Sequence, residues 1–164
     1  MFRAFAIGGF AALTLTTAAL AQTAATPTVK SVEVTVELEA IGNPAAAAYW
    51  TTVADDLENS IVAMLTDQVA DDGVNIIIDL EEVSLSGGLT EQLGLADTRL
   101  VGNVVMTHDT DNSRFGTYEL TVDVNSSTPM FPPELDVTTI PADSRVYYDA
   151  MIATFANGVV ERLK

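Results

Sequence analysis

The side chains best suited to catalysis or metal binding are gathered in the run HDTDN at residues 108–112. His108 is the only histidine, so it is the only candidate for a histidine general base, and Asp109 and Asp111 add carboxylates that suit a metal ion. Asp and Asn are also the residues that form turns through hydrogen bonds to nearby backbone groups. We therefore predict a turn here, and keep a divalent-cation site or a hydrolase centred on His108, Asp109 and Asp111 as the alternative.

Other catalytic and cofactor sites lack the residues that their chemistry requires. Arg114 stands where a calcium loop needs glycine, and Leu120 stands where it needs a bidentate glutamate. No Gly-x-Ser-x-Gly motif surrounds a serine, and Gly87-Gly88 lacks the lysine of a phosphate-binding loop. The absence of cysteine excludes thiolate metal sites and cysteine nucleophiles. We expect no catalytic residue and no cofactor, although a carboxylate pair for glycoside chemistry stays open among the 23 acidic residues.

The charge of the chain narrows the choice of partner. Its 164 residues are 48% apolar, which suits one globular domain with its own core. They carry 7 Lys and Arg against 23 Asp and Glu, for a formal net charge of −16. Nucleic acids and anionic membrane surfaces are bound through clustered Lys and Arg, so neither is expected as a direct partner. A protein with a basic surface fits the charge better.

The first segment is typical of a secretory signal peptide. Arg3 is followed by an uncharged apolar run over residues 4–19, and the small residues of Ala19-Leu20-Ala21 form a cleavage pattern. We predict cleavage between Ala21 and Gln22, a flexible lead-in over residues 22–30, and one domain over residues 31–164. No other segment reaches the length of a membrane span, so a mature chain without a transmembrane segment, periplasmic or secreted, is expected. Export without cysteine is compatible with a bacterial periplasm.

The hydrophobic pattern of the remaining chain predicts an α+β fold in the order β-α-β-β-β-α. Alternating residues indicate strands, and apolar residues spaced three and four apart indicate helices. The expected strands span residues 31–40, 74–80, 98–108 and 115–125, and the expected helices span residues 45–69 and 142–163. Two amphipathic helices and half-buried strands predict a two-layer sandwich, with one mixed four-stranded sheet and both helices on one face. The first two strands are expected to be parallel and the others to form a meander.

This element order behind an export signal resembles small bacterial envelope assembly domains, such as the lipopolysaccharide-assembly auxiliary lipoproteins and their transport-accessory relatives. The likeness covers most of the mature chain, residues 22–164, and is one of topology, because no residue motif carries it. The resemblance implies a role in envelope assembly, but it assigns no functional residue. The chain departs from these proteins in lacking the cysteine at which they are lipidated.

Strand parity predicts an acidic outer face on the sheet. One basic residue, Arg99, is expected there, together with the apolar residues Ile77, Val101, Val105 and Phe115. The acidic residues expected on this face are Glu33, Glu37, Glu39, Asp79, Glu81, Glu119 and Asp123. An acidic face with apolar islands is suited to docking a basic partner.

The loop TPMFPPEL at residues 128–135 is a second candidate contact, because its prolines favour an extended backbone that partners recognise. Met130 and Phe131 either meet a partner there or fold back over the end of the core. We therefore expect an exported, acidic, non-enzymatic binding or assembly module of the bacterial envelope, or alternatively a structural envelope component. The predicted partner-binding residues are Glu37, Glu119, Asp123, Met130 and Phe131.

Overall fold

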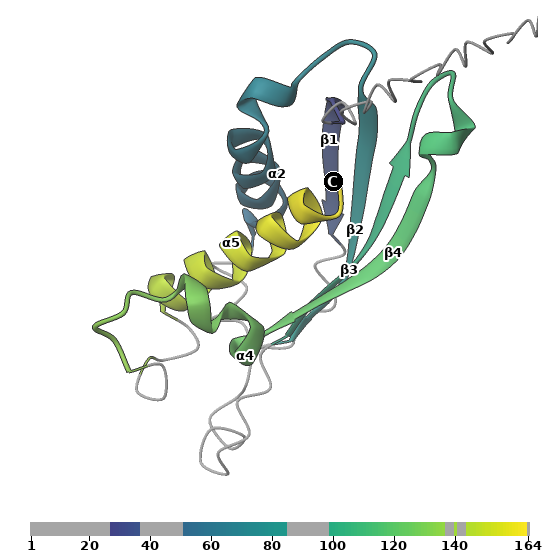
Figure 1. Cartoon of the computed structure of the whole chain (residues 1–164). Coiled ribbons are helices and arrows are strands. Elements are labelled where there is room, and N and C mark those ends of the chain that lie inside the picture. Colours follow the sequence, from purple (N-terminus) through teal and green to yellow (C-terminus); the bar gives the residue numbers. More distant parts are fainter. Residues whose placement is uncertain (1–26, 37–50, 85–98, 137–139, 141–143, 164) are drawn as a thin grey trace, which may run out of the picture.

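The computed structural model of the chain describes residues 27–36, 51–84, 99–136, 140 and 144–163 (Figure 1). Four strands and two longer helices follow one another in the predicted order β-α-β-β-β-α. The bounds of these six elements are β1 Val29–Val36, α2 Val53–Met64, β2 Val74–Ser84, β3 Arg99–Thr107, β4 Gly116–Asp123 and α5 Arg145–Glu161. The shorter elements are the helix α4 at Val124–Ser127 and the 3-10 turns η2 at Thr66–Gln68, η3 at Asn112–Arg114 and η4 at Thr128–Met130.

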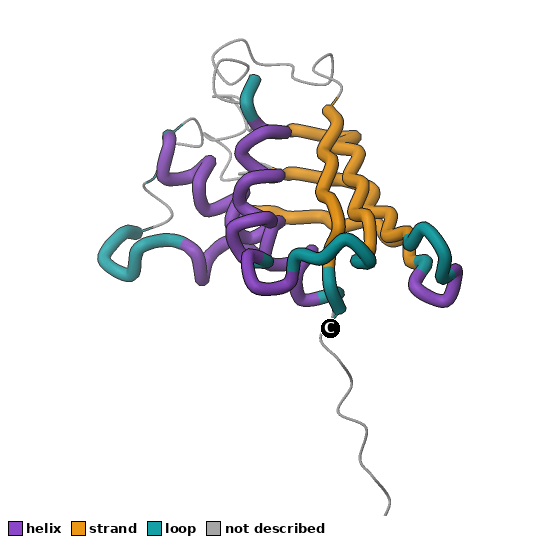
Figure 2. Tube along the Cα trace, turned by 90° about the horizontal axis from the view of Figure 1, so that it is seen from above, coloured by secondary structure: helices purple, strands orange, loops and turns teal. Residues whose placement is uncertain are grey.

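The four strands form one mixed sheet in the order β1-β2-β3-β4. β1 and β2 are parallel, and the pairs β2–β3 and β3–β4 are antiparallel. A parallel neighbour requires a long crossover, and α2 lies within that connection. Viewed from above, the helices form one layer and the strands the other (Figure 2). The predicted two-layer α+β sandwich is confirmed.

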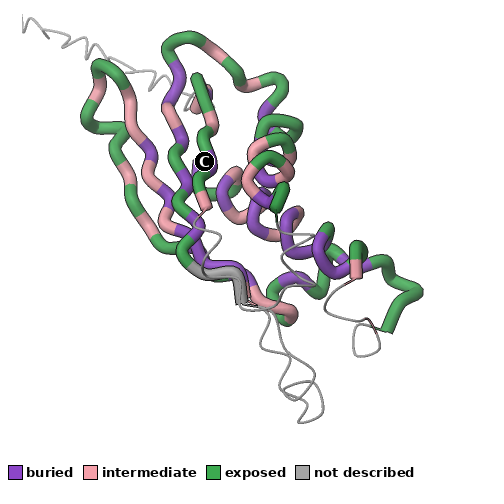
Figure 3. Tube along the Cα trace, turned by 180° about the vertical axis from the view of Figure 1, so that it is seen from behind, coloured by how far each residue is buried: buried purple, intermediate pink, exposed green. Residues whose placement is uncertain are grey.

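The core lies between the sheet and the two helices. Along the strands, buried and exposed positions alternate (Figure 3), as expected for a sheet with one covered face. Among the largest fully buried side chains are Leu57 and Ile61 on α2, Ile76 and Ile78 on β2, and Met151 and Phe155 on α5. Burial of these apolar side chains holds the helices against the sheet.

The observed bounds of several elements differ from the predicted ones. β1 begins at Val29, inside the predicted lead-in, and β2 continues to Ser84, past the predicted end at Leu80. The predicted loop after β4 contains two short helical turns, because Asp123 forms a reciprocal capping box with Ser126. The signal segment, its cleavage site, Glu37 and Glu39 lie outside the described residues. No helix in the described part of the chain is long and apolar enough to cross a membrane.

One polar contact ties the two helices together. The Tyr148 hydroxyl on α5 donates to Asp56 Oδ2 on α2 at 2.5 Å, and Thr52 Oγ1 donates to the same oxygen at 2.9 Å. The Arg145 guanidinium lies 5.0 Å from the centre of the Tyr148 ring. The hydrogen bond from Tyr148 lowers the pKa of the Asp56 carboxyl, because it stabilises the charged form. Burial, followed by the nearby carboxylate, raises the pKa of Tyr148.

We predict that Tyr148→Phe lowers the free energy of unfolding at neutral pH by about 1.5–3 kcal/mol, because a hydrogen bond to a charged group is lost. Since the pKa of Asp56 is lower folded than unfolded, its contribution is present above the unfolded value. It is lost as pH falls through the folded value, so the difference from wild type should shrink in acid. Urea unfolding at neutral and acidic pH measures both effects.

The control for this variant is Tyr118→Phe. Among the described residues, the buried Tyr118 hydroxyl has no hydrogen-bond partner, and burial raises the pKa of Tyr118 to about 12. Removal of that hydroxyl should leave stability unchanged or raise it. An equal loss of stability in both variants would show that the Tyr148–Asp56 bond is not what joins the helices.

Candidate functional site

The outer face of the sheet is the face that the helices do not cover. Strand pairing places Thr35, Asp79, Asn103 and Glu119 in one row across all four strands. The neighbouring row contains Glu33, Ile77, Val105 and Thr117. The predicted outward positions of Glu33, Ile77, Asp79, Val105 and Glu119 therefore agree with the register, and these side chains are exposed or half-buried.

Hydrogen bonds hold part of the first row in place. Asn103 Nδ2 donates to Glu81 Oε1, and Thr35 Oγ1 donates to Asp79 Oδ1 at 3.2 Å. Neutral donors orient two of the carboxylates without cancelling their charge. Ile77 in the adjacent row is 39% exposed, so an apolar side chain lies beside the charged ones.

Four carboxylates of this face take part in none of the ion pairs that the described residues form. These ion pairs join Lys30 to Asp109, Arg114 to Asp111 and Arg145 to Asp149. We use the name acidic sheet face for the side chains of Glu33, Asp79, Glu81 and Glu119, none of which takes part in these pairs. Because no ion pair of the described residues neutralises them, these carboxylates are available to a basic partner.

Asp123, a predicted partner contact, has a structural task. Its carboxylate accepts from the backbone N–H of Ser126 at 2.8 Å and caps α4. This bond is the main reason that the pKa of Asp123 is lowered, and the nearby Arg99 contributes less. Arg99 is also its directly opposite neighbour across β3 and β4. Asp123 therefore lies at the end of the outer face and is already occupied.

The two predicted contact residues of the loop at residues 128–135, Met130 and Phe131, differ in their exposure. Phe131 is only 6% exposed, and its ring packs edge to face on Tyr147 with 5.7 Å between ring centres. Met130 is 39% exposed. Phe131 thus folds back over the core, the second of the two predicted arrangements, and does not offer its ring to a partner here. The sequence pattern shows that both side chains are apolar, but the burial of Phe131 depends on its contact with Tyr147 of α5.

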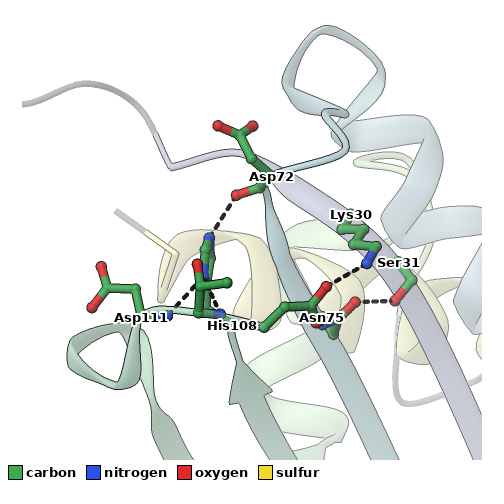
Figure 4. A network of polar contacts seen from close by, with 8 residues as sticks. Lys30, Ser31, Asp72, Asn75, His108 and Asp111 are labelled. Atoms are coloured by element: carbon green, nitrogen blue, oxygen red, sulfur yellow. Dashed lines mark hydrogen bonds and ion pairs between the residues drawn. The ribbon is translucent and has the colours of Figure 1, made fainter.

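The hairpin tip is held by His108 (Figure 4). Its Nδ1 accepts from the backbone N–H groups of Thr110 at 3.3 Å and Asp111 at 3.1 Å. Its Nε2 lies 2.6 Å from the Asp72 carbonyl oxygen. Because a carbonyl only accepts and Nδ1 is already an acceptor, the proton of the neutral ring lies on Nε2. Both ring nitrogens are engaged, and the predicted turn is confirmed.

The two aspartates of the tip bind different partners. Asp109 accepts from Lys30 Nζ at 2.5 Å and from Asn75 Nδ2 at 2.9 Å (Figure 4), and the bond from Lys30 is the main cause of its lowered pKa. Asp111 accepts from Ser113 through the hydroxyl at 2.6 Å and the backbone N–H at 3.0 Å, which lowers its pKa. The described residues contain no group of three side chains placed to hold a metal ion.

The carbonyl bound by His108 is positioned by a close backbone approach. Gly73 follows Asp72 directly, and a Cβ atom on Gly73 would lie 2.4 Å from the Val29 carbonyl carbon. Only glycine permits this approach, which places the turn before β2 against the start of β1. The sequence pattern does not indicate that Asp72, Lys30 and Asn75 meet the hairpin tip, because these partners are 36, 79 and 34 positions away along the chain.

No protein-family model matches the chain, and no curated protein matches it either.

His108 stabilises the hairpin tip through the contacts of its two ring nitrogens. The free energy of unfolding of a variant should therefore decrease with each of these hydrogen bonds that is lost. We predict that His108→Ala lowers the free energy of unfolding by about 1–2 kcal/mol, because the contact with Asp72 and the acceptor at Nδ1 are both lost. His108→Asn keeps an acceptor near the position of Nδ1 and should lose about half as much. Urea unfolding measures the order of the three proteins.

The cation alternative is tested with the wild-type protein and an Asp109→Asn variant. The carboxylate oxygens of Asp109 and Asp111, which would have to bind the cation, already accept hydrogen bonds from protein groups. Millimolar calcium or zinc should therefore leave the wild-type melting temperature unchanged. A rise in melting temperature that Asp109→Asn abolishes would contradict the structural role and restore the cation site.

Proposed function

We propose that the protein is an exported, non-enzymatic binding or assembly module of the bacterial envelope, and that it docks a partner with a basic surface on the acidic sheet face. The observation that carries the proposal is a group of exposed carboxylates, Glu33, Asp79, Glu81 and Glu119, that lie on the sheet face opposite α2 and α5 and form no ion pair among the described residues. No observation favours the hydrolase or cation-binding alternative, because the groups of the hairpin tip are engaged.

Electrostatics and shape both support such a contact. Like charges on neighbouring strands repel one another, and Lys or Arg side chains of a partner would remove that repulsion. The field of a chain with a net charge of −16 also steers a basic partner during approach. Ile77 and the half-buried Val105 supply apolar surface beside the charges. Met130 extends the candidate surface only if a partner reaches beyond the sheet.

The location in the envelope is supported by the N-terminal pattern and by the element order. An apolar run after Arg3 that ends in Ala19-Leu20-Ala21 fits an exported precursor. The order β-α-β-β-β-α is the one in which the chain resembles envelope assembly domains. Neither a cofactor nor a catalytic group is part of this proposal.

Export predicts a new N-terminus. Protein recovered from the periplasmic or culture fraction should begin at Gln22, because a signal peptidase cuts after the small residue Ala21. Mass spectrometry of the intact protein measures this, and Ala21→Tyr should leave the precursor uncut. Cytoplasmic protein that still begins at Met1 would contradict the export proposal.

Docking predicts that crosslinking depends on the face and on its charge. A photo-crosslinking residue in place of exposed Ile77 should capture a basic envelope protein in cells. Asp79→Lys with Glu119→Lys should lower the yield at least about tenfold, since attraction becomes repulsion. Mass spectrometry identifies the captured protein, and higher salt should weaken the complex in lysates.

Two controls separate the surface from total charge and from chance contact. Asp55→Lys with Asp67→Lys makes the same charge change on exposed helix-side residues and should leave the yield unchanged. A crosslinker in place of Val62, an exposed residue of α2, should not capture the same protein. Equal capture from both faces, or capture that survives reversal at Asp79 and Glu119, would overturn the proposal.

A further inference from the structure

A cleft of about 630 Å³ lies at the end of the sandwich where the hairpin tip, the start of β1 and the end of α5 meet. Its lining includes Thr28, Asp72, Arg114, Phe115, Arg162 and Leu163. These residues come from four separate parts of the chain, so the cleft exists only in the folded protein. Its volume falls within the range of small-molecule sites.

The charge of the cleft differs from that of the rest of the protein. Arg114 and Arg162 both line it, although the whole chain has only 7 basic residues against 23 acidic ones. Asp72 is the one acidic residue among the lining residues of this cleft. An anionic ligand, disfavoured by the chain as a whole, therefore has a local site with complementary charge.

The two guanidinium groups retain capacity for a ligand. Arg162 Nη1 donates to the Gly158 carbonyl at 2.9 Å, and its guanidinium lies 4.9 Å from the centre of the Tyr118 ring. Arg114 Nε lies 3.5 Å from Asp111 Oδ2. Each guanidinium has five N–H donors, so one contact of this kind leaves others for a planar anion. The contacts also hold the side chains in place, which lowers the entropy cost of binding.

The remaining surface of the cleft is apolar. Phe115 is 59% exposed, the highest value among the large apolar side chains that the structure describes. Val74, Met106 and Leu163 also line the cleft and are buried. An exposed aromatic ring beside buried aliphatic side chains suits the apolar body of a ligand.

We propose that this cleft binds a small amphiphile with one anionic headgroup, a carboxylate or a phosphate, placed at Arg114 and Arg162 with its apolar body along Phe115. The site goes beyond the proposed docking function. It lies at the end of the sandwich on other residues than the acidic sheet face, so either proposal can fail without the other.

The test titrates purified full-length exported protein with four probes below their micelle concentrations, followed by calorimetry and by NMR shifts of the amides at the cleft. Octanoate and octyl phosphate carry the two candidate headgroups, octanol has no charge, and acetate has no apolar body. We expect one or both anionic amphiphiles to bind at least about tenfold more tightly than octanol and acetate, because both parts of the ligand are recognised. Their ratio identifies the headgroup.

Variants locate the binding. Arg114→Gln with Arg162→Gln should weaken the anionic amphiphile at least about tenfold, and Phe115→Ala, at an exposed position, should weaken it without disturbing the fold. Arg145→Gln is the matched control. Like Arg162, Arg145 lies over a tyrosine ring, but it is at the N-terminal end of α5, whereas Arg162 is at the C-terminal end. Absence of binding, binding of octanol at equal strength, or affinity that survives both cleft variants would overturn the proposal.

Discussion

The parallel pairing of β1 with β2 dictates how the helices are placed on the sheet. It requires a crossover, which contains α2 and lays that helix on one face of the sheet. α5 then packs beside α2 on the same face, where Tyr148 meets Asp56. Because both helices cover one face, the other is left as an open surface of alternating outward side chains. The acidic sheet face is a consequence of this topology.

Charge is distributed unevenly over the resulting surfaces. On the outer face, Glu33, Asp79, Glu81 and Glu119 form no ion pair among the described residues, whereas two arginines line the cleft at the end of the sandwich. The chain has only 7 Lys and Arg residues against 23 Asp and Glu, so the positions of these basic residues indicate where the protein needs positive charge. Lys30, Arg114 and Arg145 form ion pairs, and Arg114 and Arg162 line the cleft, where a ligand can reach them.

The residue types of the hairpin tip fit both a functional site and a structural turn. His108, Asp109 and Asp111 have the chemistry of a metal or acid–base site. Their hydrogen bonds to Asp72, Lys30 and Ser113 instead close a turn and attach it to the body of the protein. Satisfied polar groups of this kind stabilise a conformation and leave little capacity for a substrate.

Sequence periodicity predicts the element order, the two-layer architecture and the outward positions of Glu33, Asp79 and Glu119, because periods of two and of three to four residues follow directly from strand and helix geometry. Tertiary structure alone decided that Phe131 is buried, that His108 binds the carbonyl of Asp72, and that Arg114 and Arg162 share a cleft. These facts depend on contacts between residues far apart in the chain. Local periodicity carries no information about such contacts, and only the packed fold brings them together.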